Sequence, residues 1–414
     1  MSSSPLRRPR ALRALNSGGR LLRRLGVRPV DLAPDSLLAG ASRRAGLADF
    51  GDARFREALE RLSRALDEEA RLSLLGRLIA RRDLVQTLEN RLRLLDERRR
   101  HPEIADEPIE APLFIVGLPR TGTSILHELL AQDPENRVPL TWEVMWPCPR
   151  PEAGSFDTDP RIARAERQLG AADRLIPDFK KMHRMGARLP QECCMLMNHD
   201  LMSVQFHTTY NVPSYQDWLN RQDLAPVYAF HRAQLQHLQS RAPARHWVLK
   251  SPQHLWTLEA LLRVYPDARI VHTHRDPLKA VTSVASLVSL LRSMASDDVD
   301  PLEIGADWTR LIADAVDRTL RVREARSGEP ERFFDMHFRE YLADPVAMVG
   351  RIYRHFGRGL SPGAEQRMRR YLAAHPADEH GRHRYAPEAF GLDPRALRAR
   401  FERYRERFAV AEEP

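Results

Sequence analysis

One segment, residues 112–130, constrains the fold of this chain more than any other. Its apolar run Leu113–Val116 predicts a buried strand, and the glycine-flanked stretch Gly117–Gly122 predicts a tight loop. A helix is expected to open at Thr123 or Ser124. A loop of this kind turns backbone N–H groups and a helix N-terminus toward one point, which suits a phosphate group. The segment therefore predicts an anion-binding strand–loop–helix unit.

This loop departs at one position from the pattern G-x-x-x-x-G-K-[ST] that binds nucleoside triphosphates. Gly117 and Gly122 have the required spacing, and Ser124 holds the final hydroxyl position. Thr123 stands where that pattern carries its lysine, and the cation comes earlier, at Arg120. The loop thus keeps the phosphate cradle without the side chain that grips a triphosphate.

Strands and helices continue to alternate further along the chain. Strand Trp247–Leu249 leads into a helix over Leu255–Val264, and strand Ala268–His272 is followed by a helix from Leu278. Such alternation predicts an α/β fold, a P-loop NTPase-like parallel sheet flanked by helices. Because ligands of these sheets bind beyond the strand C-termini, we expect the loops after the strands to line one crevice.

The chain divides into three regions. Residues 1–35 predict a flexible basic tail, and residues 36–110 a helical N-terminal extension, because apolar residues recur there at helical spacing. Residues 111–414 form the α/β domain, with a helical insertion over about 140–240 that we expect to bind the substrate. Aromatic residues of this insertion either build its core or line an acceptor pocket: Trp142, Trp146, Phe206, Tyr210, Tyr215 and Trp218.

The net charge of +9 favours anionic ligands, such as a phosphate-rich cofactor or nucleic acid, although a GC-rich genome also enriches arginine. The three cysteines, Cys148, Cys193 and Cys194, match neither a disulfide framework nor a zinc site, which indicates a reducing cytoplasm.

Targeting segments are not evident in the sequence. Met1–Arg28 lacks the apolar stretch of a secretory signal, and its basic composition suits a flexible tail, a mitochondrial transit peptide or a surface-binding helix. The apolar run Ala280–Leu291 is too short and too polar to predict a membrane span.

A second anion-binding feature follows the strand Ala268–His272. Arg275 lies just past this strand, where its guanidinium can bind a phosphate with two hydrogen bonds. Ser283 lies eight residues later, about two turns into the next helix, so both side chains can meet on one anion. Taken alone, Arg275 would more readily pair with Asp276 or another surface acid.

Together the two motifs resemble those of the sulfotransferase family, which uses 3′-phosphoadenosine-5′-phosphosulfate (PAPS) as donor. In that family a loop of the type P-[KR]-[ST]-G-[ST]-[ST] binds the 5′-phosphosulfate, and an arginine with a serine eight residues later binds the 3′-phosphate. The resemblance runs from about Pro112 to Phe408 and assigns Arg275 and Ser283 to the 3′-phosphate. The residues it assigns to the 5′-phosphosulfate are Pro119, Arg120, Thr121, Gly122, Thr123 and Ser124.

The resemblance also implies catalytic groups. Lys250 matches the family's active-site lysine, which bridges the 5′-phosphate and the transferring group. Arg120 replaces the loop lysine of many members and keeps its charge. No metal is expected, because cations and N–H groups can neutralise the charge that develops on the leaving phosphate. A basic, glycine-containing segment near the C-terminus adds Arg382 and Arg384 as ligands of the 3′-phosphate.

Three residues are candidates for the base that takes the acceptor's proton: His183, Glu192 and His254. Members with a histidine close after the strand lysine favour His254, although its spacing from Lys250 is longer here. Members with a glutamate ahead of that strand favour Glu192. His183 and Glu192 flank one segment, so either can instead orient the acceptor.

The sequence thus predicts a cytoplasmic, PAPS-dependent sulfotransferase that releases 3′,5′-ADP. Its acceptor is a hydroxyl, or less readily an amine, of a small molecule, lipid or carbohydrate. We expect no nucleic-acid partner and no integral membrane segment, and a homodimer stays open. Two other classes compete: a P-loop kinase or NTPase, which would need a lysine at Thr123 and an acidic metal ligand, and a basic protein that binds nucleic acid or membrane through residues 1–30.

Overall fold

The computed structural model describes residues 16–19, 25, 29–175, 184–376 and 386–413. Five parallel strands of these residues form one sheet in the order β2-β3-β1-β4-β5. The strands are β1 (Leu113–Gly117), β2 (Asn136–Arg137), β3 (His246–Lys250), β4 (Arg269–His274) and β5 (Phe333–His337). The predicted parallel α/β sheet is confirmed, with two short outer strands that the sequence did not reveal.

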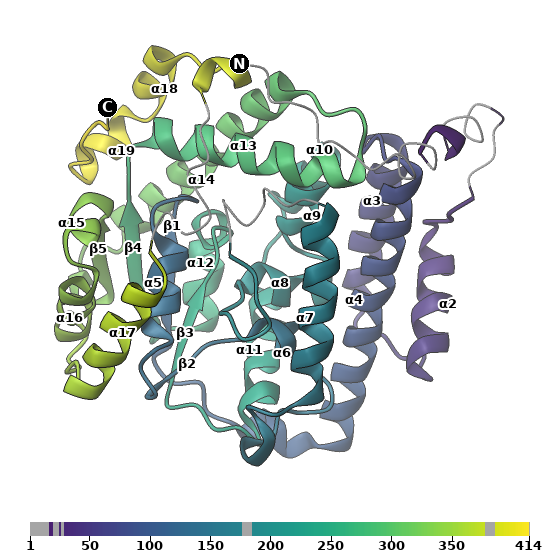
Figure 1. Cartoon of the computed structure of the whole chain (residues 1–414), viewed down its shortest axis with the longest axis horizontal. Coiled ribbons are helices and arrows are strands. Elements are labelled where there is room, and N and C mark those ends of the chain that lie inside the picture. Colours follow the sequence, from purple (N-terminus) through teal and green to yellow (C-terminus); the bar gives the residue numbers. More distant parts are fainter. Residues whose placement is uncertain (1–15, 20–24, 26–28, 176–183, 377–385, 414) are drawn as a thin grey trace.

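Helices surround this sheet on both faces and continue toward the N-terminus (Figure 1). Those before β3 are α2 (Pro34–Ala45), α3 (Arg54–Glu68), α4 (Leu74–Arg100), η1 (Pro102–Asp106), α5 (Thr123–Leu130), α6 (Thr141–Met145), η2 (Ala153–Ser155), α7 (Pro160–Leu175), α8 (Cys193–Met197), η4 (Asn198–Asp200), α9 (Gln205–Thr209), α10 (Pro213–Leu219) and α11 (Ala225–Gln239). Those after β3 are α12 (His254–Val264), α13 (Pro277–Ala295), α14 (Pro301–Ala325), η5 (Pro330–Arg332), α15 (Phe338–Ala343), α16 (Pro345–His355), α17 (Pro362–Ala374), η6 (Pro387–Phe390), α18 (Pro394–Arg400) and α19 (Glu402–Arg407).

The two faces of the sheet bury different helices, because side chains alternate along each strand. Leu113 and Ile115 of β1 belong to an apolar cluster with residues of α5, α16 and α17. Phe114 and Val116 of the same strand belong to the larger cluster that contains α12, α13 and α14. β1 is therefore buried on both faces, as expected for a parallel sheet. Figure 1 shows α16 and α17 beside one face and the N-terminal helices farthest from them.

The N-terminal helices also contribute to the larger apolar cluster, the one that contains Phe114 and Val116 of β1. On α3 the periodic residues Phe55, Leu59 and Leu62 are buried, as helical spacing predicts. A buried ion pair joins α4 to η4: Arg91 NH1 lies 2.6 Å from Asp200 Oδ1, and the two side chains are 4% and 8% exposed. The N-terminal helices thus pack against the helices of residues 140–240.

Helix α13 leaves the C-terminal end of β4. It opens at Asp276, whose Oδ1 accepts the Leu278 N–H at 3.0 Å. Among the described helices it alone has the length and hydropathy, 1.3 on average, of a membrane span. Two thirds of that window, 67%, is buried inside the protein, which is the position of a core helix.

Six aromatic residues of the 140–240 region, those that the sequence offered as core or pocket residues, build the interior, which was one of their two predicted roles. None is more than 7% exposed. They are Trp142, Trp146, Phe206, Tyr210, Tyr215 and Trp218.

Candidate functional site

The loop between β1 and α5 has a tightly restricted shape. A Cβ at Gly117 would lie 1.9 Å from Thr273 Oγ1, so only glycine fits where β1 meets β4. Gly122 caps α5 with a φ of 84°. Arg120 has a φ of 68°, a left-handed conformation that costs a side-chain-bearing residue on the order of 1–2 kcal/mol. Such backbone strain is typical of a functional loop.

Hydrogen bonds of Thr121, which is fully buried, hold the conformation of the loop. Thr121 Oγ1 donates to the Leu118 carbonyl at 2.7 Å and lies 2.6 Å from Thr273 Oγ1. Its hydroxyl therefore braces the loop against β4. Pro119 and Gly122 are half-buried in the same loop.

Lys250 ends β3 beside this loop and lies next to Ile115 of β1 in the sheet register. Its Nζ donates to Ser124 Oγ at 3.1 Å. The same ammonium forms an ion pair with Glu192, the residue before α8. Lys250 is 4% exposed and Glu192 20%. A strand, a helix N-terminus and the insertion thus bring together a cation, a hydroxyl and a carboxylate.

Arg120 and Arg275 connect the loop after β1 to the segment after β4. Arg120 Nε donates to Ser283 Oγ at 3.2 Å. Arg275 NH1 donates to the Arg120 carbonyl at 2.7 Å, and its guanidinium lies 4.1 Å from the centre of the Phe338 ring. The structure therefore gathers the two predicted phosphate motifs at one edge of the sheet.

This arrangement concentrates positive charge. Arg120 and Arg275 follow β1 and β4, and Lys250 ends β3. Lys250 contacts Ser124 of α5, Arg120 contacts Ser283 of α13, and Arg275 contacts the Arg120 carbonyl. Guanidinium groups bind phosphate and sulfate oxygens through paired hydrogen bonds, and an ammonium acts as a point charge. These residues therefore fit a ligand with several anionic groups.

His254 does not reach this edge. It is fully buried, and its Nδ1 lies 2.6 Å from the Tyr228 hydroxyl. Its ring packs edge-on against Phe114, 5.1 Å between centroids, on the larger apolar cluster. Burial lowers its pKa well below the usual value. An acceptor hydroxyl has no access to this ring, so the geometry favours Glu192 over His254 as the base.

Three other predicted site residues, His183, Arg382 and Arg384, lie outside the described residues. Thr123 is buried at the start of α5, and Ser283 is buried on α13.

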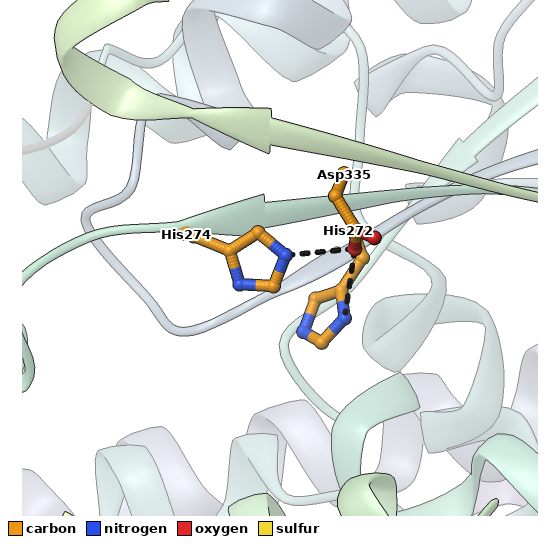
Figure 2. A group of neighbouring side chains, drawn as sticks. All are labelled: His272, His274 and Asp335. Atoms are coloured by element: carbon orange, nitrogen blue, oxygen red, sulfur yellow. Dashed lines mark hydrogen bonds and ion pairs between the residues drawn. The ribbon is translucent and has the colours of Figure 1, made fainter. Parts of the chain in front are cut away.

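A cluster of His272, His274 and Asp335 lies where β4 pairs with β5 (Figure 2). Its donors would suit a metal ion, but Arg323 donates to both Asp335 oxygens, at 2.7 and 2.8 Å. His274 Nε2 donates to Asp335 Oδ1 at 2.9 Å. Although burial opposes ionisation, the bonds from Arg323 and His274 hold the pKa of Asp335 well below its usual range. The cluster therefore forms an ion-pair network that supports the end of β4.

Two residues at the site escaped the sequence analysis. Phe338 packs on the guanidinium of Arg275. Glu413 forms an ion pair with Arg275 across 138 residues of sequence. A contact between residues so far apart in the sequence cannot be predicted from the residues around either of them.

Comparison with known proteins gives concordant results. Residues 112–362 match the family model for the sulfotransferase family. The crystal structure of sulfotransferase STF9 from Mycobacterium avium has a TM-score of 0.86 and 32% identity, covering 93% of this chain and 99% of that one. Sulfotransferase STF1 from Mycobacterium tuberculosis has a TM-score of 0.79 and 34% identity, covering 90% and 98%. The omega-hydroxy-beta-dihydromenaquinone-9 sulfotransferase Stf3 of Mycobacterium bovis is 27% identical over 278 residues, 64% of this chain and 68% of that protein.

Proposed function

We propose, since this chain belongs to the sulfotransferase family, that it transfers a sulfuryl group from PAPS to an acceptor hydroxyl and releases 3′,5′-ADP. One observation carries the proposal: Lys250 Nζ lies 3.1 Å from Ser124 Oγ and pairs with Glu192 beside the strained loop. This places a cation, a helix N-terminus and a proton acceptor at one point, as direct transfer between two oxygens requires.

The donor binds across the edge of the sheet. Its 5′-phosphosulfate lies at the N-terminus of α5, where Arg120, Ser124 and Lys250 supply donors and positive charge. Its 3′-phosphate lies at Arg275 and Ser283. The hydrogen bond between Arg120 and Ser283 supports this assignment, because it puts both anion sites within reach of one nucleotide.

Transfer exchanges one S–O bond for another. The acceptor oxygen attacks sulfur, the bond from sulfur to the phosphate oxygen breaks, and 3′,5′-ADP leaves. Lys250 turns from Glu192 to the transferring group and neutralises the charge that develops on the leaving phosphate. Glu192, released from that ion pair, accepts the proton of the acceptor hydroxyl.

We infer that the acceptor has an apolar body. A row of apolar side chains on α13 supports this inference. Leu287, Leu290 and Met294 follow Ser283 at helical spacing on one face, and are partly exposed beside Met185. The relative Stf3 is named for a hydroxylated menaquinone, which is a lipid-like quinone. We therefore favour a hydroxyl on a long apolar molecule over a free sugar.

A cytoplasmic location completes the proposal. All three cysteine thiols are free, and Cys193 and Cys194 are buried. Burial raises the pKa of Cys193 above its usual value, so the protonated thiol is favoured. Free, buried thiols fit a reducing compartment.

Mass spectrometry tests the transfer directly. The enzyme is incubated with PAPS and a panel of long-chain alcohols, hydroquinones and sugars, and acceptors are searched for the mass gain of one SO₃ group. We expect the gain on an apolar hydroxyl compound, with one 3′,5′-ADP per product. Glu192→Gln, which removes the proposed proton acceptor, should lower this activity. Glu331→Gln makes the same change at an exposed glutamate after α14 and should keep the activity. Transfer of phosphate from ATP to the same panel, without transfer from PAPS, would contradict the proposal.

A further inference from the structure

Arg275 holds an anion supplied by this chain itself. Its Nε lies 2.9 Å from Glu413 Oε1, and its NH2 lies 2.9 Å from Glu413 Oε2. The pair is largely buried, with 18% of the arginine and 15% of the glutamate side chain exposed. The Glu413 N–H also donates to Asp276 Oδ2 at 2.9 Å. Glu413 is therefore held at the β4 loop through both its side chain and its backbone.

The other contacts of Arg275 leave a single edge of its guanidinium for an anion. Its NH1 donates to the Arg120 carbonyl at 2.7 Å, and Phe338 covers one face of the guanidinium. The edge formed by Nε and NH2 is the one that remains for a bidentate anion. Glu413 occupies that edge with two carboxylate oxygens, in the arrangement by which a guanidinium binds phosphate.

The segment that carries Glu413 is anchored immediately before it. Tyr404 OH on α19 lies 3.0 Å from His274 Nδ1, and Phe408 stacks on the same ring at 4.2 Å between centroids. His274 precedes Arg275 on the chain. Glu412 accepts a hydrogen bond from Arg405 NH2 at 2.9 Å. Val410 is also buried, and its N–H donates to the Arg405 carbonyl at 2.8 Å. Only the residues after Val410 therefore have to move for Glu413 to leave Arg275.

We propose that Glu413 is an internal competitor for the 3′-phosphate of the donor, an inference that rests on the proposed function. In the nucleotide-free enzyme its carboxylate pairs with Arg275 and keeps this largely buried guanidinium neutralised and oriented. A nucleotide with a 3′-phosphate displaces the carboxylate from the Nε–NH2 edge, and the residues after Val410 move away. The apparent dissociation constant of the nucleotide is therefore the intrinsic constant divided by the fraction of enzyme in which Glu413 has left Arg275.

The competition depends on the ligand's chemistry. A nucleotide with a 3′-phosphate meets the carboxylate at Arg275, whereas one that carries only 5′-substituents does not. Removing the charge of Glu413 should therefore strengthen binding of the first kind of ligand and leave the second unchanged.

Calorimetric titration of the full-length enzyme tests this inference with two probes, 3′,5′-ADP and adenosine 5′-phosphosulfate, which lacks the 3′-phosphate. We expect Glu413→Gln to bind 3′,5′-ADP about 3- to 10-fold more tightly than the wild type, which corresponds to the loss of about 1 kcal/mol of competing interaction. Binding of adenosine 5′-phosphosulfate should not change. Glu406→Gln, an exposed glutamate on α19, makes the same change of charge and should leave both affinities unchanged.

Two outcomes separate this inference from the proposed function. If the wild type binds 3′,5′-ADP and Glu413→Gln binds it equally or more weakly, Glu413 only stabilises the fold and the competition is refuted. If neither protein binds 3′,5′-ADP, the donor assignment fails and the competition fails with it. Hydrogen exchange gives a second readout: saturating 3′,5′-ADP should accelerate exchange of the Glu413 amide, and slower exchange would overturn the displacement.

Discussion

Arg120 Nε donates to Ser283 Oγ at 3.2 Å, across 163 residues of sequence. This bond ties the loop after β1 to the helix after β4. Arg275 adds a second tie through the Arg120 carbonyl, at 2.7 Å. Two motifs that each suggest an anion in the sequence therefore lie in direct hydrogen-bond contact in the folded chain.

Lys250 is expected to be essential for turnover. Lys250→Met removes the ammonium that contacts Ser124 and pairs with Glu192, so the leaving phosphate loses its neutralising charge. We expect kcat to fall by about 10²- to 10³-fold, as for loss of one donor at a developing negative charge. Initial rates at saturating PAPS measure this, with the thermal midpoint as the control for folding. A kcat within twofold of the wild type would remove Lys250 from the mechanism.

Replacement by glutamine is expected to lower kcat strongly at Glu192 and only slightly at His254. Glu192→Gln should lower kcat by about 10²- to 10⁴-fold while the KM for PAPS changes little, because the proton acceptor is lost and the donor site is kept. His254→Gln should keep kcat within about threefold, because this ring is buried against Phe114 and Tyr228. Steady-state kinetics of the two variants decide between them. The reverse pattern would make His254 the base.

The ion pair between Arg91 and Asp200 is expected to stabilise the whole fold. Burial raises the pKa of Asp200 and lowers that of Arg91, so each charge depends on the other. Arg91→Ala should reduce the free energy of unfolding by about 3–5 kcal/mol, because it leaves a buried carboxylate unpaired. Urea titration measures the change. Arg61→Ala breaks an exposed pair with Glu57 and should cost less than about 1 kcal/mol. Equal effects of the two substitutions would contradict this role.

Buried histidines are expected to make the fold sensitive to acid. Burial lowers the pKa of His127 and His231 to about 3, and that of His199 and His237 to about 4. Their unfolded pKa is near 6.5, so the unfolded chain binds more protons between about pH 6.5 and pH 4. Stability is thus fully present above about pH 6.5 and falls as the pH drops through this window.

Each buried histidine contributes up to about 1.4 kcal/mol per pH unit within that window. Urea titrations at about pH 7.5, 6.5 and 5.5 should show a free energy of unfolding that falls progressively more steeply. His231→Gln removes one of these groups and should reduce the slope by about one proton. A free energy that stays constant from pH 7.5 to 5.5 would contradict the assignment of neutral, buried rings.

The sequence predicts the parts of this structure that depend on local patterns. The strand before Gly117 and the helix from Thr123 follow from apolar runs and glycine positions, and the helices before residue 100 follow from helical periodicity. β2 has only two residues, and β5 begins with two adjacent phenylalanines instead of alternating polar and apolar residues, so neither carries a clear strand pattern.

The site is predictable where a motif is contiguous and unpredictable where it depends on folding. Arg275 and Ser283 belong to one strand–helix unit, and the structure brings both to Arg120, through its carbonyl and its Nε. The choice between Glu192 and His254 needs the structure, because only burial shows that one ring faces the core. Glu413 reaches Arg275 through tertiary packing of α19, which leaves no trace in the neighbouring residues.

The most direct measurement is binding of the enzyme to immobilised 3′,5′-ADP, with elution by PAPS or by Mg-ATP. We predict that the wild type is retained, that PAPS elutes it at low concentration and that Mg-ATP does not. Arg275→Ala should pass through the column, because it lacks the guanidinium assigned to the 3′-phosphate. Elution by Mg-ATP with no effect of PAPS would contradict the assignment of this site to a phosphosulfate donor.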